Sequence, residues 1–222
     1  MAETVTIDSV GPEGRAPADV ATLNTLRVSP AGHLAAAMAA ATVEGERSVA
    51  LKEIPFTVQL GVRAEPGSAS AQALEAVFGI DLPTRHGEVA GDASALHLIW
   101  LAPDEFLAVD VSRQQGAGEA DEAAAALAGL PGQVIDLSAN RTILELSGAS
   151  ARKVLEKGCH ADLHPRAFAV GAAIVTQLGP VPIILHRTGE SEFRLYPRSS
   201  FADYQVRWLL DAMEEFASDE VR

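Results

Sequence analysis

The chain has 222 residues, of which 48% are hydrophobic and 21% are charged, so it can bury one sizeable core or two small cores fused face to face. Its 30 acidic and 17 basic residues give a formal net charge of −13, without a stripe of Lys and Arg. Such a surface repels phosphate backbones and anionic membranes, which argues against nucleic acid or a membrane as a partner.

Residues 1–28 mix Gly, Pro and polar residues without periodicity, which predicts a flexible N-terminal arm. The arm carries acidic residues and lacks the basic start and apolar core of a signal peptide. No stretch of the chain approaches the roughly 18 apolar residues that a membrane span needs. Because the single cysteine, Cys159, also fits a reducing compartment, we expect a cytoplasmic protein.

A first α+β half is predicted over residues 29–131. A Ser-Pro pair can start an alanine-rich helix over residues 33–41. The alternation of apolar and polar residues over 49–63 predicts one or two strands, with a bend at Pro55.

A second helix is predicted after these strands, capped by Ser68 or Ser70 and ended by Gly79. Its apolar face would contain Ala71, Leu74 and Phe78. Residues 97–100 and 106–111 are strand-like and flank a turn with a proline, which predicts a β-hairpin. An alanine-rich tract over 116–130 predicts a solvent-facing helix.

A second α+β half is predicted over residues 132–216. Strands over 134–137 and 142–146 should flank a polar turn. A turn-rich segment over 161–168, which we call the crossing, should follow a helix whose apolar face contains Ala151, Val154 and Leu155.

Three further strands are predicted over residues 172–178, 181–186 and 193–196. The last helix should begin with a capping box formed by Ser200 and Asp203. Its apolar stripe would consist of Phe201, Tyr204, Trp208, Leu209 and Ala212, and we interpret this stripe as core. Residues 217–222 are expected to be a C-terminal tail.

The two halves carry a faint internal repeat. At one offset of 81, Gly67, Leu74, Glu75, Asp81 and Leu82 match Gly148, Leu155, Glu156, Asp162 and Leu163. At an offset of 87, Glu105 and Phe106 match Glu192 and Phe193, and a loop can absorb the difference. A unit of this length is too long for a solenoid, so the repeat predicts duplication of a small α+β subdomain.

Few residues in the chain suggest chemistry, and the usual catalytic and phosphate-binding motifs do not occur. Cys159 follows a helix end, where a structural thiol is favoured over a reactive one. His160 and His164 have the spacing of metal ligands on a helix. Because Gly158 and Pro165 place them in an irregular segment, hydrogen bonding within turns is favoured over a metal site.

The polar turn of the second half contains Asp136, Asn140 and Arg141. Asp and Asn often accept hydrogen bonds from local backbone groups in such turns, which is the interpretation we favour. The alternative is that Asp136 and Arg141 face a partner or a ligand groove, because polar residues at strand ends on a rigid scaffold often do so.

A family resemblance rests on four strings: LAPDEFLAVD from Leu101, DLSANRTILELSGASARKVLEKGC from Asp136, ADLHPRAF from Ala161 and HRTGESEFRLYPRSSFADYQVRWLLDA from His186. In this order they resemble the gamma subunit of heterotetrameric sarcosine oxidase, from about residue 29 to residue 212. The resemblance implies an α+β fold of two related halves, similar to the folate-binding aminomethyltransferase of the glycine cleavage system.

The resemblance also implies a function. In the family's complex, alpha, beta and delta subunits accompany gamma, and the complex oxidatively demethylates sarcosine to glycine with oxygen and tetrahydrofolate. The products besides glycine are hydrogen peroxide and 5,10-methylenetetrahydrofolate. The resemblance implies that FAD, FMN, NAD, tetrahydrofolate and zinc are held by the other subunits, so that this chain binds no cofactor and is a noncatalytic component.

An alternative is an autonomous folate-dependent aminomethyl transfer or iron–sulfur maintenance protein. The string Lys157-Gly158-Cys159 is similar to one in a folate-dependent relative with the latter role, but the residues that follow it differ here. For the leading interpretation we expect the arm, the polar turn and the crossing to touch partner subunits. The candidate interface residues are Asp136, Asn140, Arg141, His160, Asp162, His164, Arg166 and Phe168.

Overall fold

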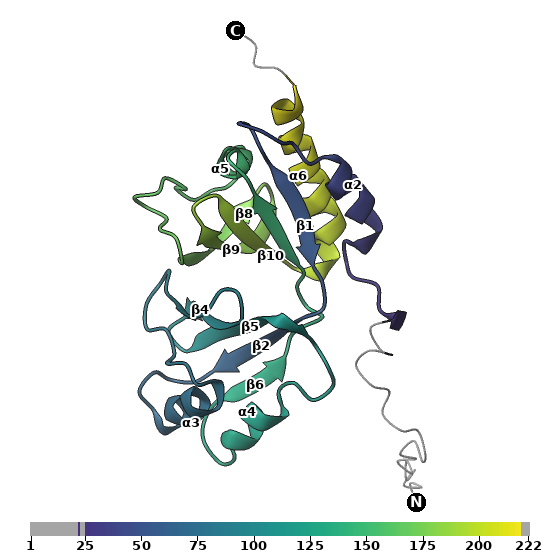
Figure 1. Ribbon diagram of the computed structural model, residues 1–222. Helices are drawn as coiled ribbons and strands as arrows, with labels where there is room; N and C mark the ends of the chain where they lie inside the picture. Colours follow the sequence, from purple (N-terminus) through teal and green to yellow (C-terminus); the bar gives the residue numbers. More distant parts are fainter. Residues whose placement is uncertain (1–21, 23–24, 219–222) are drawn as a thin grey trace, which may run out of the picture.

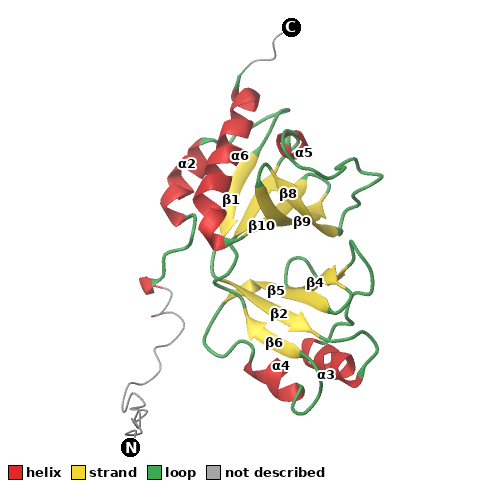
Figure 2. Ribbon diagram, turned by 180° about the vertical axis from the view of Figure 1, so that it is seen from behind, coloured by secondary structure: helices red, strands yellow, loops and turns green. Residues whose placement is uncertain are grey.

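The computed structural model describes residue 22 and residues 25–218, and it places them in two five-stranded antiparallel sheets. The sheets lie one above the other, and helices cover the outer face of each (Figure 1). Figure 2 shows the same layers from behind. The expected α+β class is therefore confirmed, and the expected N-terminal arm lies almost wholly outside the described residues.

The first sheet carries α3 (Ala69–Phe78) and α4 (Asp121–Ala126) on its outer face. Its strands, in spatial order, are β3 (Val89–Gly91), β4 (Leu96–Ala102), β5 (Glu105–Gln114), β2 (Thr57–Arg63) and β6 (Gln133–Asp136). The hairpin of β4 and β5 was predicted. The short edge strand β3 was not predicted, because three residues give no usable alternation.

The second sheet is covered by 3-10 helix η1 (Gly32–Leu34) with α2 (Ala35–Ala40), by α5 (Ala151–Glu156) and by α6 (Ala202–Ala217). Its strands, in spatial order, are β1 (Ala50–Ile54), β7 (Ile143–Ser147), β10 (Glu192–Pro197), β9 (Val181–Gly189) and β8 (Ala173–Leu178). No helix among the described residues combines the length and apolarity that crossing a bilayer would require.

Each half of the chain gives its first strand to the sheet of the other half. Strand β1 precedes β2 in the chain but pairs with β7, and β6 precedes β7 but pairs with β2. The expected division of the chain at residues 131 and 132 therefore does not coincide with the division between the sheets. It does separate two segments that, after η1 and α2 of the first, have the same order of strand, strand, helix, three-stranded meander and helix.

The residues of the sequence repeat occupy equivalent places in the two segments. Leu74 of α3 and Leu155 of α5 are both fully buried under their sheets. Phe106 and Phe193 are both buried near the start of the last strand of a meander. This agreement supports the predicted duplication, which stays a prediction.

Local signals set the ends of α3 as predicted. The Ser68 hydroxyl accepts a hydrogen bond from the Ala71 N–H, and Gly79 adopts φ 66° at the C-cap. The second alanine-rich helix is shorter than predicted. Only residues 121–126 of the expected 116–130 are helical, because Gly118 has φ 76° and Gly129 has φ 79°, outside the helical region.

The predicted start of α6 is wrong. Residues Ser199–Phe201 form the 3-10 helix η2, and no side chain caps α6. Asp203 instead accepts hydrogen bonds from Arg207 (2.8 Å) and His33 (2.7 Å), which hold its pKa at about 2. This contact ties α6 to η1.

The predicted apolar stripe of α6 is rotated in the structure. Phe201 and Tyr204 are 41% and 46% exposed, so they belong to the surface. The face that packs on the sheet consists of Ala202, Gln205, Val206, Leu209, Ala212, Met213 and Phe216. Leu209 and Ala212 are therefore core, as predicted.

We predict different costs for alanine at the two repeat glycines. Gly148 and Gly67 both have positive φ, 111° and 76°, but a Cβ at Gly148 would strike the carbonyl oxygen of Ser48 whereas a Cβ at Gly67 would meet nothing within 4 Å. That carbonyl already accepts a bond from the Ser150 N–H at 2.9 Å, so it cannot move freely. Gly67→Ala should cost about 1–2 kcal/mol and Gly148→Ala about 1–3 kcal/mol more.

Urea unfolding of both variants measures this difference. Gly67→Ala is the matched control for the backbone cost alone. Equal costs at the two positions would show that the approach of Ser48 does not constrain this turn.

Candidate functional site

The polar turn that leads from β6 to β7 connects the two sheets. Asp136, at the end of β6, accepts hydrogen bonds at Oδ1 from the Ser138 N–H (2.9 Å) and hydroxyl (2.6 Å), and Oδ2 accepts one from the Gln115 amide (3.0 Å). The buried Ser138 hydroxyl in turn accepts from the Gln59 N–H at 3.0 Å. Asp136 thus satisfies local donors, which is the interpretation that the turn residues favoured.

Arg141 stands at the centre of this connection. Its Nη1 donates to the Tyr196 carbonyl at 3.0 Å, and its own carbonyl accepts from the Gln59 side chain at 3.0 Å. Its backbone forms a β-bridge with Arg198, whose Nη1 donates to Asn140 Oδ1 at 3.2 Å. Burial, and then the positive charge of Arg198, lower the pKa of Arg141.

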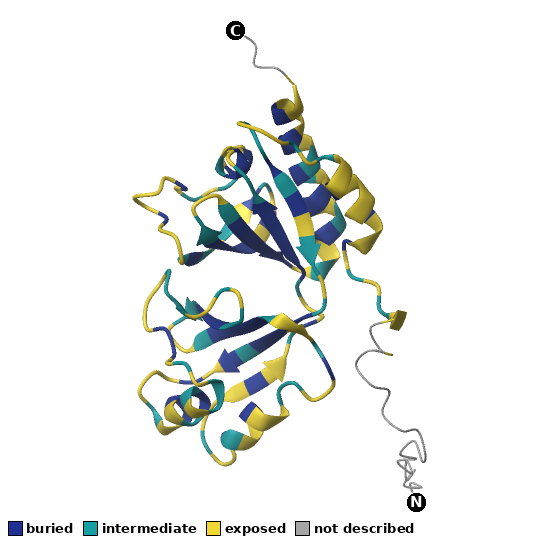
Figure 3. Cartoon of the chain, in the orientation of Figure 1, coloured by how far each residue is buried: buried dark blue, intermediate teal, exposed yellow. Residues whose placement is uncertain are grey.

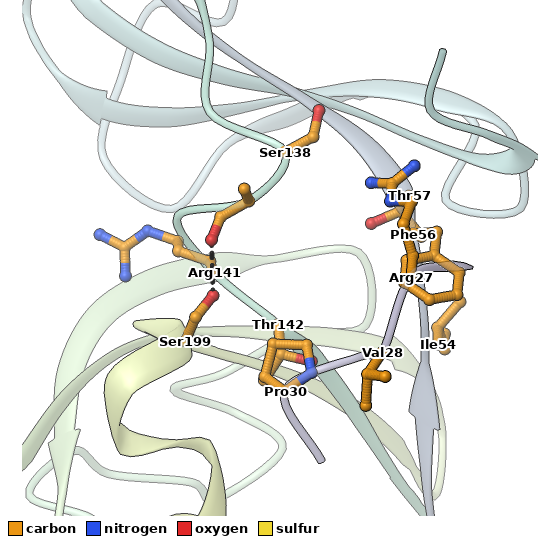
Figure 4. Close-up of a pocket in the computed structure, with 11 residues that line it drawn as sticks. Arg27, Val28, Pro30, Ile54, Phe56, Thr57, Ser138, Arg141, Thr142 and Ser199 are labelled. Atoms are coloured by element: carbon orange, nitrogen blue, oxygen red, sulfur yellow. Dashed lines mark hydrogen bonds between the residues drawn. The ribbon is translucent and has the colours of Figure 1, made fainter. Parts of the chain in front are cut away.

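A pocket of about 220 Å³ opens on one side of this connection (Figure 4). Arg27 and Phe56 form one wall, with the Arg27 guanidinium 4.7 Å from the centre of the Phe56 ring. The Arg141 guanidinium points away from this pocket, as Figure 4 shows. It lies instead on the side of a second pocket, which Arg141 also lines.

The crossing contributes exposed polar residues at another place. In Figure 1 the crossing projects from the upper sheet on the side opposite the connection between the sheets. Its side chains satisfy local backbone groups, as predicted: Asp162 Oδ1 accepts from the His164 N–H at 2.9 Å, and His164 Nδ1 accepts from the Arg166 N–H at 3.2 Å. His160, Asp162, His164 and Arg166 are all exposed.

Phe168 is not at the surface, which corrects its inclusion among the candidate interface residues. It is 2% exposed and stacks on Phe193 with ring centres 6.5 Å apart. Its carbonyl accepts from the buried Arg187 side chain at 2.7 Å. Phe168 therefore anchors the end of the crossing in the core of the second sheet.

Neither the two histidines considered as metal ligands nor the single thiol has unusual surroundings. No cluster of three or more His, Cys, Asp or Glu suited to a metal ion occurs within residue 22 and residues 25–218. Cys159 is half-buried, packs against the core of the second sheet, and has its Sγ 4.0 Å from the Thr176 hydroxyl.

A polar row on the second sheet, buried except at its exposed first member Lys52, was missed by the sequence analysis. Lys52, Glu145, Arg194 and His186 are successive cross-strand neighbours on β1, β7, β10 and β9. Glu145 binds Lys52 at 2.7 Å and Arg194 at 3.1 Å, and Arg194 also donates to the Ala93 carbonyl of the first sheet's β3–β4 turn. The row could have been predicted from the charged residues that interrupt otherwise apolar strands.

Two histidines meet at the end of this row. The rings of His186 and His97, from opposite sheets, have centres 5.3 Å apart, and both residues are fully buried. Neither nitrogen of His186 has a hydrogen-bond partner among the described residues. Burial lowers the pKa of His97 and lowers that of His186 to about 3, so both rings are neutral near pH 7.

We predict that His186 makes folding sensitive to acid. The unfolded chain takes up a proton at this residue near pH 6.5 and the folded chain only near pH 3, so stability is full above pH 6.5 and falls as the pH drops toward 3. The slope should approach about 1.4 kcal/mol per pH unit. Urea unfolding between pH 6 and 5 should therefore show a shallower slope for His186→Leu than for the wild type.

The exposed His160 offers the control. His160→Leu should keep the slope of the wild type. A slope that His186→Leu leaves unchanged would show that His186 is not held neutral in the folded chain.

The fold and these sites define a two-layer α+β scaffold of the aminomethyltransferase type. Aminomethyltransferase T of the glycine cleavage system from Bartonella henselae superposes with a TM-score of 0.52 at 21% identity, over 73% of this chain and 45% of that chain. That likeness concerns the fold alone. It confirms the α+β fold similar to the aminomethyltransferase that the family resemblance implied, while the relation between the two halves stays a prediction.

The chain belongs to the sarcosine oxidase, gamma subunit family, whose model matches residues 61–215. It is 53% identical to the sarcosine oxidase subunit gamma of Corynebacterium sp. (strain U-96) over 88% of this chain and 94% of the relative, and 55% identical to that of Arthrobacter sp. over 89% and 95%. These matches support the predicted family over the autonomous alternative.

A solved structure gives the same result. A chain of the heterotetrameric sarcosine oxidase from Corynebacterium sp. U-96, in complex with pyrrole 2-carboxylate, superposes with a TM-score of 0.85 at 53% identity. The match covers 89% of this chain and 100% of that chain. The fold of this chain therefore matches the fold of the solved relative over the length that the two chains share.

Proposed function

We propose that the chain is the noncatalytic, structural gamma subunit of a cytoplasmic heterotetrameric sarcosine oxidase, with alpha, beta and delta subunits as partners. The complex demethylates sarcosine oxidatively to glycine and forms hydrogen peroxide and 5,10-methylenetetrahydrofolate. In this proposal FAD, FMN, NAD, tetrahydrofolate and zinc are held by the other subunits.

The observation that carries the proposal is similarity to gamma subunits along nearly their whole length, including a chain of the solved heterotetrameric enzyme. The polar side chains of this chain support a structural role. Asp136, Asp162 and His164 bind neighbouring backbone groups.

Co-expression of the four subunits tests the proposal. With this chain present, we expect it to co-purify with the other subunits in a complex that releases hydrogen peroxide from sarcosine. Without it, assembly or activity should be lost. Full assembly and activity without this chain would overturn the structural role, and binding of tetrahydrofolate to the isolated chain in calorimetry would favour the alternative of an autonomous folate protein.

The candidate interface residues are part of the proposal, with Phe168 confined to a structural role. The other members, all exposed except the half-buried Arg141, contact partners through two surfaces, the polar turn and the crossing with the adjoining His160. Asp136, Asn140 and Arg141 belong to the first, and His160, Asp162, His164 and Arg166 to the second.

Charge reversal at each surface tests these contacts. Because a misplaced like charge at an interface costs binding energy, Arg141→Glu and Arg166→Glu should each weaken assembly by about 3- to 10-fold. Analytical gel filtration of the co-expressed subunits measures the loss, with Lys153→Glu on α5 as a charge-matched control. Normal assembly of one variant would remove its surface from the proposal and leave the other in place.

A further inference from the structure

The apolar layer between the sheets continues into an open groove. Tyr196, Ile184 and Val175 are cross-strand neighbours on β10, β9 and β8, and they face the first sheet. Tyr196 and Ile184 are buried, whereas Val175, at the sheet edge, is 57% exposed. Along this row the first sheet covers only as far as Ile184, although it does cover Ala173 at the start of β8.

The groove has a volume of about 380 Å³ and lies between β8, the turn that joins β4 to β5, and η2. We call it the edge groove. Its apolar residues include Val175 and Phe201, which is 41% exposed, and its polar residues are Glu105, Arg141 and Arg198. Apolar side chains beside arginines are a composition typical of the centres of protein interfaces.

The two arginines of the edge groove form no ion pair, and the only carboxylate that acts on Arg141 among the described residues, that of Glu105, does so without direct contact. Neither Arg141 nor Arg198 has a carboxylate at ion-pair distance within the described part of the chain. The nearby Glu105 is engaged by Arg63 at 2.9 Å. Two adjacent guanidinium groups, one of them partly buried, leave a positive potential that an anion would stabilise.

This positive site contrasts with the rest of the protein, whose net charge is −13. Most cations on the sheets and helices are paired with carboxylates of this chain, as in the pairs of Lys52 with Glu145 and Arg207 with Asp203. A second copy of so acidic a chain is repelled at long range. The charge pattern therefore favours an acidic group of a different protein.

The free edge of β8 is closed at both ends, which argues against addition of a long strand. The Ala173 N–H donates to the Gly87 carbonyl at 3.2 Å, and the Gln177 carbonyl accepts from the His160 N–H at 3.1 Å. A partner must therefore bind mainly through side chains, with little backbone pairing.

We infer that the edge groove receives an acidic surface segment of another subunit of the complex, with a carboxylate between Arg141 and Arg198 and an apolar side chain over Val175 and Phe201. The inference rests on the proposed function for the existence of the partner, and it adds the site and the chemistry of the contact. Charge-assisted bonds to guanidinium groups and burial of the exposed apolar surface both favour this occupant.

Binding of the purified full chain to the alpha, beta and delta subunits, co-expressed without it, tests the inference. Arg198→Glu should raise the Kd at least about tenfold and weaken its dependence on salt, because a charge contact is lost. Phe201→Ser should raise the Kd by about 3- to 10-fold and leave the salt dependence unchanged, because only apolar area is lost. Lys153→Glu, on α5, should bind like the wild type.

The outcomes separate the inference from the proposed function. If the wild type does not bind the other subunits, both fail. If the wild type binds and Arg198→Glu and Phe201→Ser bind equally well, the inference fails while the proposed function stands. Far-ultraviolet circular dichroism and urea midpoints verify that both variants are folded.

One further result would also overturn the inference. If the isolated chain dimerises in gel filtration and Arg198→Glu makes it monomeric without affecting binding to the other subunits, the occupant is a second copy.

Discussion

The contact between the inner faces of the two sheets is the interaction on which the rest of the structure depends. Its apolar part joins residues such as Ile99 and Leu107 of the first sheet to Ile143 and Ile184 of the second. Figure 3 shows buried residues, in dark blue, along strands of both sheets. Its polar part is the row that ends at His186. A buried charge pair contributes little to stability by itself, but removing one member leaves the other without compensation. The row therefore favours one register of the strands and one placement of the sheets.

The exchange of first strands follows from the same contact. Strand β1 supplies Lys52, which neutralises the second carboxylate oxygen of Glu145, and Ile54, which packs in the apolar layer. If β1 stayed with its own half, Glu145 would keep only Arg194. The two halves are thus parts of one cooperative unit, because each sheet is complete only with a strand from the other half.

Sequence reasoning succeeded where the signal is local. The serine cap and terminal glycine of α3, the hairpin of β4 and β5, and the polar turn at Asp136 all rest on neighbouring residues, and the structure has them. The predictions were wrong where a side chain binds a residue far away in the chain and not its neighbours in sequence. The predicted capping box of α6 does not form, because Ser200 lies in η2 and the Asp203 carboxylate accepts from His33, which is distant in the chain, and from Arg207. The polar row was missed because its members align only once the register of four strands is known.

A chain that acts by binding partners should show its function where its own packing stops. The row of Tyr196, Ile184 and Val175 begins inside the core and ends in solvent, so the edge groove is a core layer left without its cover. Because Val175 and Phe201 are exposed to water, their apolar surface does not contribute the stabilisation that burial would give. Placing two unpaired arginines beside them adds repulsion. Both costs are removed by a single acidic and apolar segment, which is why the groove is better explained by a partner than by the fold alone.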